Sequence, residues 1–182
     1  LGLDRVDVLH IHDAEHRQEE ALAGAYRALD RLRAEATIRA VGAGLNFPEP
    51  LVRFAREADF DCFLVAGRLT LLDRTALPEL LPLCFELGIA VILGGVFNSG
   101  VLAGGTTFDY RPAPPEVLER VRRLDETCAR HCVPLAAAAL QFPLRHRAVT
   151  SLLLGARSPA ELDESLDLLE LEIPDDLWAE LG

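Results

Sequence analysis

The segment DVLHIHDAEH, residues 7–16, places two imidazoles and a carboxylate where a hydrophobic strand is predicted to end. His10 and His12 share one face of an extended strand, because side chains alternate along it, and Asp13 follows at once. A histidine at a strand end can donate a hydrogen bond to a substrate oxygen that gains charge in a reaction. The residues alone leave open whether His12 does this or is a core histidine bonded to the main chain. We expect His10, one pleat deeper, to fill the core, and Asp13 to be a loop acid or an orienting group.

A second candidate site is the segment GARSPAEL near the end of the chain. Ser158 and Glu161 form the S-x-x-E pattern of a capping box, and Pro159 falls on the first helical position. Such a helix start exposes free N–H groups and a positive dipole end, which bind phosphate. Gly155 permits close approach of the main chain to a ligand, and Arg157 adds positive charge. The alternative is an ordinary capped helix.

The composition predicts one globular domain over residues 1–182. Half of the residues are hydrophobic, and the chain is long enough to bury a sizeable core. The net charge of −11 argues against a nucleic-acid partner, since phosphate binding needs a basic face. The longest apolar runs are short and broken by glycine, and no basic segment precedes an apolar one at the start, so neither a membrane span nor a signal peptide is predicted. We expect no membrane partner and a cytoplasmic location.

The four cysteines predict neither a disulfide framework nor a metal site. Cys62 and Cys84 lie in apolar segments typical of a core. Cys128 and Cys132 are four residues apart with His131 between them. A zinc site typically needs a second close pair of ligands, which the sequence does not provide. We therefore expect a plain helix end here, and reduced thiols, as is usual in the cytoplasm.

Strands and helices alternate along the chain. The predicted strands cover residues 5–12, 38–44, 60–67, 89–95 and 148–155. The predicted helices cover residues 19–36, 50–57, 75–87, 115–130, 135–144 and 159–169, with a last short helix after the sequence IPDD. The strands are near-continuous apolar runs, which indicates that both of their faces are buried, as in a parallel sheet.

Five successive strand–helix units predict the α/β class. No G-x-G-x-x-G fingerprint opens a helix, which leaves a doubly wound dinucleotide fold unsupported. The alternative is a (β/α)8 barrel, which typically needs eight units and about 250 residues, and whose active site lies where the strands end. Since the chain has five units and no methionine, we predict that it forms the C-terminal five βα units of such a barrel, with the N-terminal units absent.

Six segments along the chain match one protein family in order and in spacing. They are DVLHIHD, VGAGLN, FLVAGRLTLLD, GGVFNSGVLAGG, PLAAAALQF and LLLGARSPAELDESL. Together they resemble the second half of the aldo-keto reductases, most closely the aldose 1-dehydrogenase branch. This resemblance implies a (β/α)8 barrel that binds NAD or NADP across the carboxyl ends of its strands. It also implies hydride transfer between the nicotinamide and a carbonyl or lactol carbon.

The resemblance further implies which residues take part in the chemistry. In the family, a tyrosine acts as acid or base, with help from a lysine, an aspartate and a histidine. The first three lie in the first half of the family's barrel, and the present chain contains no lysine. Only the histidine has a counterpart here, which is His12. We therefore expect His12 to be the catalytic residue of this chain, and the chain on its own to be inactive.

The resemblance also implies a set of cofactor contacts. Asn46 matches the asparagine that holds the nicotinamide carboxamide, whose donor and acceptor an amide side chain can pair. The alternative for Asn46 is a helix N-cap, because Glu49 follows three residues later. The other predicted contacts are the pyrophosphate loop residues Asn98, Ser99, Gly100 and Leu102, the phosphate loop residues Gly155, Ala156 and Arg157, and Ser165, which falls where the family faces the adenine.

The chain departs from the family's pattern at three positions. The glutamine that usually joins the asparagine on the carboxamide is replaced by Ala66. Arg68 is kept from an arginine–aromatic pair of this branch, but its aromatic partner is replaced by Leu69. The aromatic residue that stacks on the nicotinamide elsewhere in the superfamily falls near Gly94 and is absent. NAD and NADP both stay possible, because Arg157 could bind a 2′-phosphate while this branch often prefers NAD.

Three classes of function are consistent with these residues. The first is an NAD(P)-dependent oxidoreductase segment that acts at C1 of an aldose or on a small aldehyde, with that small molecule as its partner. The second is a non-catalytic relative that keeps the cofactor site as a binding subunit. The third is a barrel enzyme with a phosphosugar substrate, which GARSP alone does not exclude. We favour the first class because six segments match in order.

Overall fold

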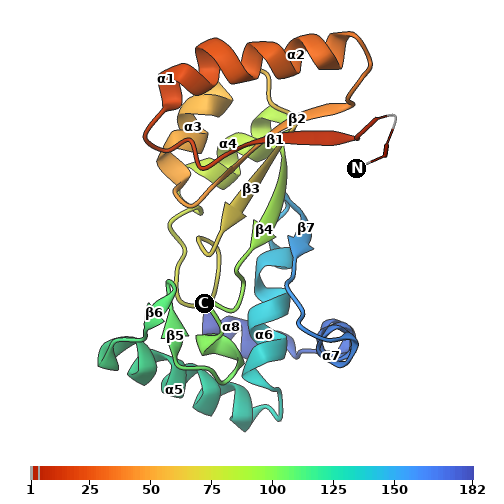
Figure 1. Ribbon diagram of the computed structural model, residues 1–182. Helices are drawn as coiled ribbons and strands as arrows, with labels where there is room; N and C mark the ends of the chain where they lie inside the picture. Colours follow the sequence, from red (N-terminus) through yellow and green to blue (C-terminus); the bar gives the residue numbers. More distant parts are fainter. Residues whose placement is uncertain (1, 4) are drawn as a thin grey trace.

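The chain forms an open sheet of five parallel strands, shown in Figure 1 by a computed structural model that describes residues 2–3 and 5–182. The strands are β1 Val8–His12, β2 Ala40–Leu45, β3 Cys62–Ala66, β4 Ala90–Gly94 and β7 Val149–Leu153. They lie side by side in chain order, and each neighbouring pair is parallel. The predicted α/β class with five strand–helix units is confirmed.

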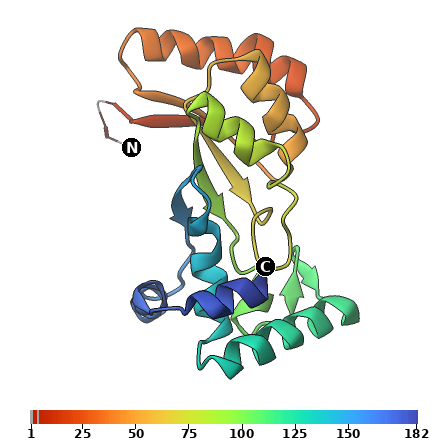
Figure 2. The ribbon, with the colours of Figure 1, turned by 180° about the vertical axis from the view of Figure 1, so that it is seen from behind.

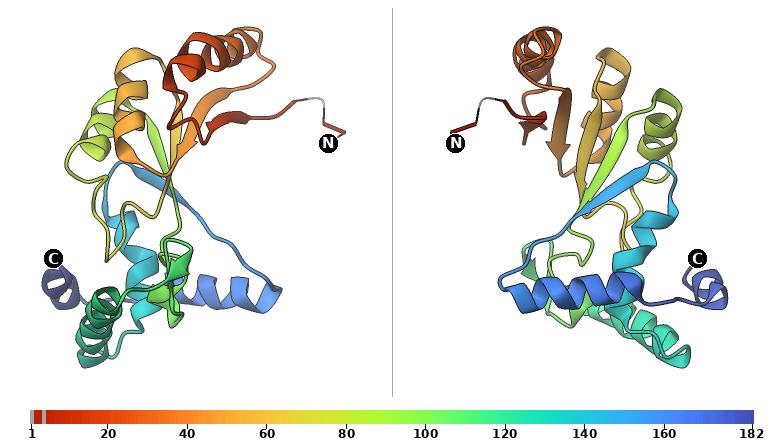
Figure 3. Two further views of the ribbon diagram at one scale, coloured as in Figure 1. Left: turned by 60° about the vertical axis from the view of Figure 1, so that its left-hand side comes forward. Right: turned by 90° about the vertical axis from the view of Figure 1, so that its right-hand side faces the viewer.

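Helices and a small hairpin complete the fold. The helices are α1 Gln18–Glu20, α2 Arg27–Ala34, α3 Pro48–Glu57, α4 Leu80–Leu87, α5 Pro115–Arg130, α6 Leu135–Gln141, α7 Pro159–Glu170 and α8 Asp175–Leu181. In Figure 3, α1 to α4 gather on one side of the sheet. The strands β5 Thr107–Phe108 and β6 Arg111–Pro112 form an antiparallel pair that the sequence analysis did not predict, because two-residue strands carry no readable periodicity. No helix in the described part of the chain is long and apolar enough to cross a membrane.

Prolines shift three helix boundaries from their predicted positions. α3 begins at Pro48 instead of residue 50, because the proline ring already holds a helical φ. α4 begins at Leu80 instead of residue 75, because Pro78 disfavours helical geometry at the residue before it. α6 ends at Gln141 instead of residue 144, because Pro143 has no N–H to donate, and a 3-10 turn follows.

The predicted helix over residues 19–36 is not continuous. A π-helical segment, Ala21–Tyr26, separates α1 from α2. The side chains of this segment are mostly small, and the sequence pattern holds no signal that separates i→i+5 from i→i+4 hydrogen bonding. The prediction was therefore right about helical structure and wrong about its kind.

The main core lies between the sheet and the helices α3 and α4. The outward-facing side chains Val41, Phe63 and Val91 are fully buried there. Phe60 ties the layers together, since its ring centroid lies 5.5 Å from that of Phe54 in α3 and 5.4 Å from that of Phe63 in β3. This burial of apolar and aromatic area is what holds the helices on the sheet.

The prediction that every strand is buried on both faces is wrong for the outer strands. Val8 of β1 is 39% exposed and Leu153 of β7 is 54% exposed. Each of these strands pairs with one neighbour only in the described sheet. The inner face, opposite the helices, is therefore open at both ends of the sheet, which a local apolar run does not reveal.

A second core packs the elements at the other end of the molecule. Leu102, Val117, Cys128, Leu135 and Leu177 belong to it and come from four different segments. Figure 2 shows α8 lying beside α5 at the end opposite α1. All four cysteines are free thiols, three of them buried and Cys132 exposed, so the prediction that Cys62 and Cys84 lie in the core is confirmed.

The two histidines of β1 share the inner face of the sheet, as predicted. His10 lies opposite Gly42 of β2, which lies opposite Cys62 of β3, and His12 lies opposite Gly44. The His10 Nε2 is 3.6 Å from the Cys62 Sγ. Burial lowers the pKa of His10, with a further contribution from His12, and burial raises the pKa of the Cys62 thiol. His10 is therefore a neutral packing residue at neutral pH.

We predict that Gly42→Ala destabilises the protein by about 1–2 kcal/mol because of overpacking. A Cβ at residue 42 would lie 2.5 Å from the His10 Cδ2 and 2.9 Å from the Cys62 Sγ. Gly44→Ala is the matched control, since its nearest contact would be 3.4 Å away, and we expect a change within about 0.5 kcal/mol. Urea unfolding of the full-length protein measures both. In a His10→Ala background, Gly42→Ala should cost less; an equal cost in both backgrounds would show that the contact with His10 is not the cause.

Candidate functional site

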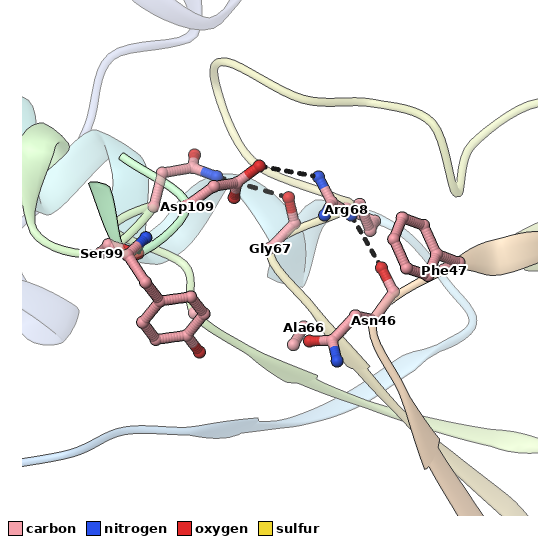
Figure 4. Close-up of a pocket in the computed structure, with 10 residues that line it drawn as sticks. Asn46, Phe47, Ala66, Gly67, Arg68, Ser99 and Asp109 are labelled. Carbon is pink, nitrogen blue, oxygen red and sulfur yellow. Dashed lines mark hydrogen bonds and ion pairs between the residues drawn. The ribbon is translucent and has the colours of Figure 1, made fainter. Parts of the chain in front are cut away.

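The carboxyl ends of the five strands meet at one edge of the sheet, and two adjoining cavities lie there. The first has a volume of about 340 Å³ and the second about 630 Å³. Figure 4 shows the first cavity, whose walls come from the segments that follow β2, β3 and β4. Its lining residues are Asn46, Phe47, Ala66, Gly67, Arg68, Gly95, Asn98, Ser99, Asp109 and Tyr110. The two cavities share four of these residues: Asn46, Ala66, Gly95 and Tyr110.

Arg68 connects the walls of the first cavity. Its Nε donates to the main-chain oxygen of Asn46 at 2.8 Å, and its Nη1 donates to the Asp73 Oδ2 at 2.9 Å (Figure 4 shows the first contact). The same Nη1 lies 3.5 Å from the Asp109 Oδ2 on the β5–β6 turn. The guanidinium carbon is 5.4 Å from the centroid of the Phe47 ring, within cation–π range. One side chain therefore joins the segments after β2, β3 and β4.

The Arg68–Asp73 ion pair is largely shielded from solvent. The Arg68 side chain is 17% exposed and that of Asp73 is 14% exposed. Burial alone would raise the pKa of Asp73, but hydrogen bonds from Thr75 and Arg68 outweigh it and hold the pKa below its ordinary value. The pair is thus charged at neutral pH. Loss of Arg68 would leave the Asp73 carboxylate poorly compensated, whereas loss of Asp73 would leave Arg68 with Asp109 as its nearest carboxylate.

The segment that follows β4 is strained and carries an unpaired buried oxygen. Asn98 is 2% exposed, its Nδ2 donates to the Gly67 oxygen at 3.4 Å, and its Oδ1 is buried without a hydrogen-bond partner among the residues that the structure describes. Asn98 and Ser99 have φ values of 45° and 59°, which non-glycine residues seldom adopt. The Ser99 Oγ accepts a hydrogen bond from the Tyr110 N–H at 3.0 Å. Strain and unpaired polar atoms of this kind gather at ligand sites.

Between the ends of β3 and β4, the first cavity is lined by the main chain of Gly67 and Gly95. The Gly67 N–H donates to the Gly94 oxygen at 2.9 Å. Gly95 has a φ of 63°, and a Cβ added there would lie 3.2 Å from the Gly67 nitrogen. Glycine is therefore favoured at residue 95 by both its conformation and its closeness to Gly67.

The second cavity contains the predicted catalytic histidine. His12 lines it together with Asn46 and Gly155. The His12 Nδ1 lies 3.3 Å from the Asp13 Oδ2, and the His12 side chain is 73% exposed. The Cδ2 edge of the ring faces Gly44 of the neighbouring strand. The exposed ring offers at least one N–H donor in any protonation state.

The helix start predicted in the last βα loop is confirmed. α7 begins at Pro159, and the Ser158 Oγ accepts a hydrogen bond from the Glu161 N–H at 3.3 Å. The Glu161 carboxylate accepts from the main-chain N–H of Arg157 at 2.8 Å and pairs with the Arg157 guanidinium at 2.7 Å. Hydrogen bonds from Arg157 hold the pKa of Glu161 below its ordinary value. The Arg157 side chain is 91% exposed, so it can leave Glu161 for a ligand at small cost.

Five predicted site residues line the cavities and five do not. His12, Asn46, Asn98, Ser99 and Gly155 are the ones in the walls. The predicted contacts that do not line either of these two cavities are Gly100, Leu102, Ala156, Arg157 and Ser165. Leu102 is buried in the second core, with 1% of the whole residue exposed, and the Ser165 Oγ donates to the main-chain oxygen of Glu161 at 2.9 Å. The roles of all ten residues stay predictions.

The alternative prediction for Asn46, a helix N-cap, is wrong. Phe47 occupies the N-cap of α3, and no side chain caps that helix. The sequence analysis also missed the ring that accompanies Arg68. Leu69, where the family's aromatic was expected, is 2% exposed in the core, whereas Phe47 from the preceding loop lies against the guanidinium. No local signal could show this, because Phe47 and Arg68 belong to different βα units.

Solved structures of other proteins show which fold class the chain has. A glycerol dehydrogenase from Gluconobacter oxydans superposes with a TM-score of 0.75 at 20% identity, covering 98% of this chain and 58% of that chain. The holo form of an aldo-keto reductase from Bacillus halodurans gives a TM-score of 0.77 at 20% identity, covering 98% and 60%. The five parallel units are therefore part of a (β/α)8 barrel, which confirms the predicted fold.

The family follows from the sequence comparison. Residues 1–182 match the Aldo/keto reductase family, and the chain belongs to this family. It is 44% identical over 188 residues to a D-threo-aldose 1-dehydrogenase from Pseudomonas sp and 42% identical over 195 residues to a pyridoxal 4-dehydrogenase from Microbacterium luteolum. Each match covers 100% of this chain and 57% of the relative. The chain thus spans a little over half the length of these relatives, and the predicted likeness to the aldose dehydrogenase branch is confirmed.

We predict that Arg68→Met lowers the free energy of unfolding by about 2–4 kcal/mol, because it leaves the shielded Asp73 carboxylate without its ion-pair partner. Asp73→Asn should also destabilise, and the double variant should cost less than the sum of the single ones by roughly 1–3 kcal/mol. Urea unfolding of the full-length proteins at neutral pH gives the three values. Arg17→Met is the matched control, since Arg17 pairs with Glu20 on the surface, and it should cost less than about 1 kcal/mol. Strictly additive effects would show that Arg68 and Asp73 do not stabilise each other.

Proposed function

We propose that this chain belongs to an NAD(P)-dependent oxidoreductase that transfers a hydride between a nicotinamide cofactor and C1 of an aldose or a small aldehyde. The observation that carries the proposal is that His12 and Asn46 line the same cavity at the carboxyl edge of the sheet. His12 can donate a hydrogen bond to the reacting oxygen of the substrate, and the Asn46 amide can pair with the carboxamide of a nicotinamide. The family, and relatives named as an aldose and a pyridoxal dehydrogenase, support this reaction class.

The residues at the edge of the sheet fit a nicotinamide dinucleotide. The Asn46 amide can pair with a carboxamide, and the unpaired Oδ1 of Asn98 needs a polar partner. The glycine floor at Gly67 and Gly95 leaves main chain open to a ligand. The capped start of α7, with Arg157 beside it, suits the phosphates. When bound, the nicotinamide would supply or accept a hydride at its C4 carbon.

His12 would stabilise charge on the substrate oxygen. In reduction of a carbonyl, that oxygen gains negative charge as hydride arrives at carbon, and an N–H donor in place lowers the barrier. Asp13, close to the His12 Nδ1, would orient the ring. We propose that proton transfer needs a tyrosine and a lysine that these 182 residues do not supply at matching positions, since they include no lysine. The chain on its own would then give no turnover.

The full-length protein should bind NADH or NADPH, as calorimetric or fluorescence titration will show. Within that site, Arg157→Ala should weaken NADPH about three- to tenfold more than NADH if Arg157 meets the 2′-phosphate, a modest effect because the side chain is exposed and already paired. Arg17→Ala, which removes an exposed arginine paired to Glu20, is the control. Equal effects on both dinucleotides would refute this role of Arg157. Binding of neither at millimolar concentration would refute the cofactor assignment.

His12→Ala should lower kcat by about a hundredfold or more while leaving the cofactor Kd nearly unchanged, because the donor acts mainly in the transition state. Steady-state assays with aldoses and small aldehydes measure kcat, and titration measures Kd. His12→Gln, which keeps an N–H donor, should recover part of the rate. His10→Ala should cost stability and spare the rate per folded molecule. A kcat for His12→Ala within about threefold of wild type would instead favour a packing role, and cofactor binding with no wild-type turnover would favour a binding subunit.

A further inference from the structure

Asn46 is held at both ends of its main chain by charged side chains. Its N–H donates to the Glu15 Oε1 at 2.9 Å, and its carbonyl oxygen accepts from the Arg68 Nε at 2.8 Å. Glu15 lies in the loop between β1 and α1, and Arg68 follows β3. The residue at the end of β2 is thus fixed from the two neighbouring βα loops. The hydrogen-bonding groups left to Asn46 are those of its side-chain amide.

Glu15 also determines which way that amide points. The Asn46 Nδ2 lies 3.4 Å from the same Glu15 Oε1. An ionised carboxylate only accepts hydrogen bonds, so the NH2 end of the amide must face Glu15 and the Oδ1 end must face away from it. Burial alone would raise the pKa of Glu15, but the hydrogen bonds from Asn46 outweigh it and hold the pKa below its ordinary value. The carboxylate is therefore charged at neutral pH.

Glu15 is itself fixed in place without lining either cavity at the sheet edge. Its main-chain oxygen accepts from the Gln18 Nε2 at 2.9 Å, and Ala14 beside it is buried in the main core. Asn46, by contrast, lines both cavities, and Figure 4 shows it next to Ala66, where the family's usual glutamine is missing. Asn46 therefore stands without the second amide expected there, and its orientation depends on Glu15.

We propose that Glu15 is a positioning residue that turns the Asn46 Oδ1 toward the nicotinamide, so that the site recognises the NH2 group of the carboxamide. The inference rests on the proposed function and deepens it. An acceptor oxygen aimed at the ligand favours a carboxamide, which has N–H donors, over an acetyl group, which has none. A site with a freely rotating amide would not make this distinction, because either end of the amide could face the ligand.

Calorimetric binding of three ligands to the full-length protein tests the proposal: NAD, its 3-acetylpyridine analogue and ADP-ribose, or the 2′-phosphorylated forms if those bind more tightly. The wild type should bind NAD about five- to tenfold more tightly than the acetylpyridine analogue, as expected for one neutral hydrogen bond. In Glu15→Met, which keeps the length of the side chain without an acceptor, that ratio should fall to within twofold of unity. The affinity for ADP-ribose, which lacks the ring, should stay unchanged.

Three variants make the result decisive. Glu15→Gln keeps one acceptor oxygen and should restore most of the NAD preference, and Glu15→Ala should behave like Glu15→Met. Glu20→Ala, which removes an exposed carboxylate paired with Arg17 in the next helical turn, should leave all three affinities as in the wild type. An unchanged ratio in both Glu15→Met and Glu15→Ala, or equal weakening of all three ligands, would overturn the proposal and leave Glu15 a structural role. A wild type that binds none of the ligands would overturn the proposed function and this inference with it.

Discussion

The register of the parallel strands determines where the strand residues of the site lie. His10, Gly42 and Cys62 stand in one row across β1, β2 and β3, and the middle position has no room for a Cβ. A slip by one residue would turn the side chains of a strand to the opposite face, which would bring Val41 into that row. Because the strands are parallel, their carboxyl ends form one edge, and the segments that follow them meet there.

Arg68 connects the loops at that edge to one another. It reaches the loop after β2 through the Asn46 oxygen, its own loop through Asp73, and the hairpin after β4 through Asp109. A guanidinium carries five N–H donors in a planar fork, so it can serve several acceptors at once, which a lysine could not do in this geometry. The desolvation of the charge is offset because Asp73 is charged and itself hydrogen-bonded by Thr75.

The helix-covered face of the sheet is tightly packed, whereas its carboxyl edge is strained. The helix side is apolar and aromatic, with Phe54 and Phe63 fully buried. The carboxyl edge holds the positive φ values of Asn98 and Ser99 and the unpaired oxygen of Asn98. Each such feature costs roughly 1–3 kcal/mol, so it persists because the packed side of the fold supports it. A ligand that pairs the oxygen would recover part of this cost.

The sequence by itself determined the alternation of strands and helices, the shared face of His10 and His12, and the capped start of α7 at Ser158, because each depends on periodicity or spacing within one element. It also predicted that His12 ends its strand and that Asn46 directly follows the next one. Only the tertiary structure decided that Phe47 lies against Arg68 and that Glu15 holds Asn46. These contacts join residues about 20 to 30 positions apart, and they depend on loop dihedral angles and on packing between βα units, which no local pattern records.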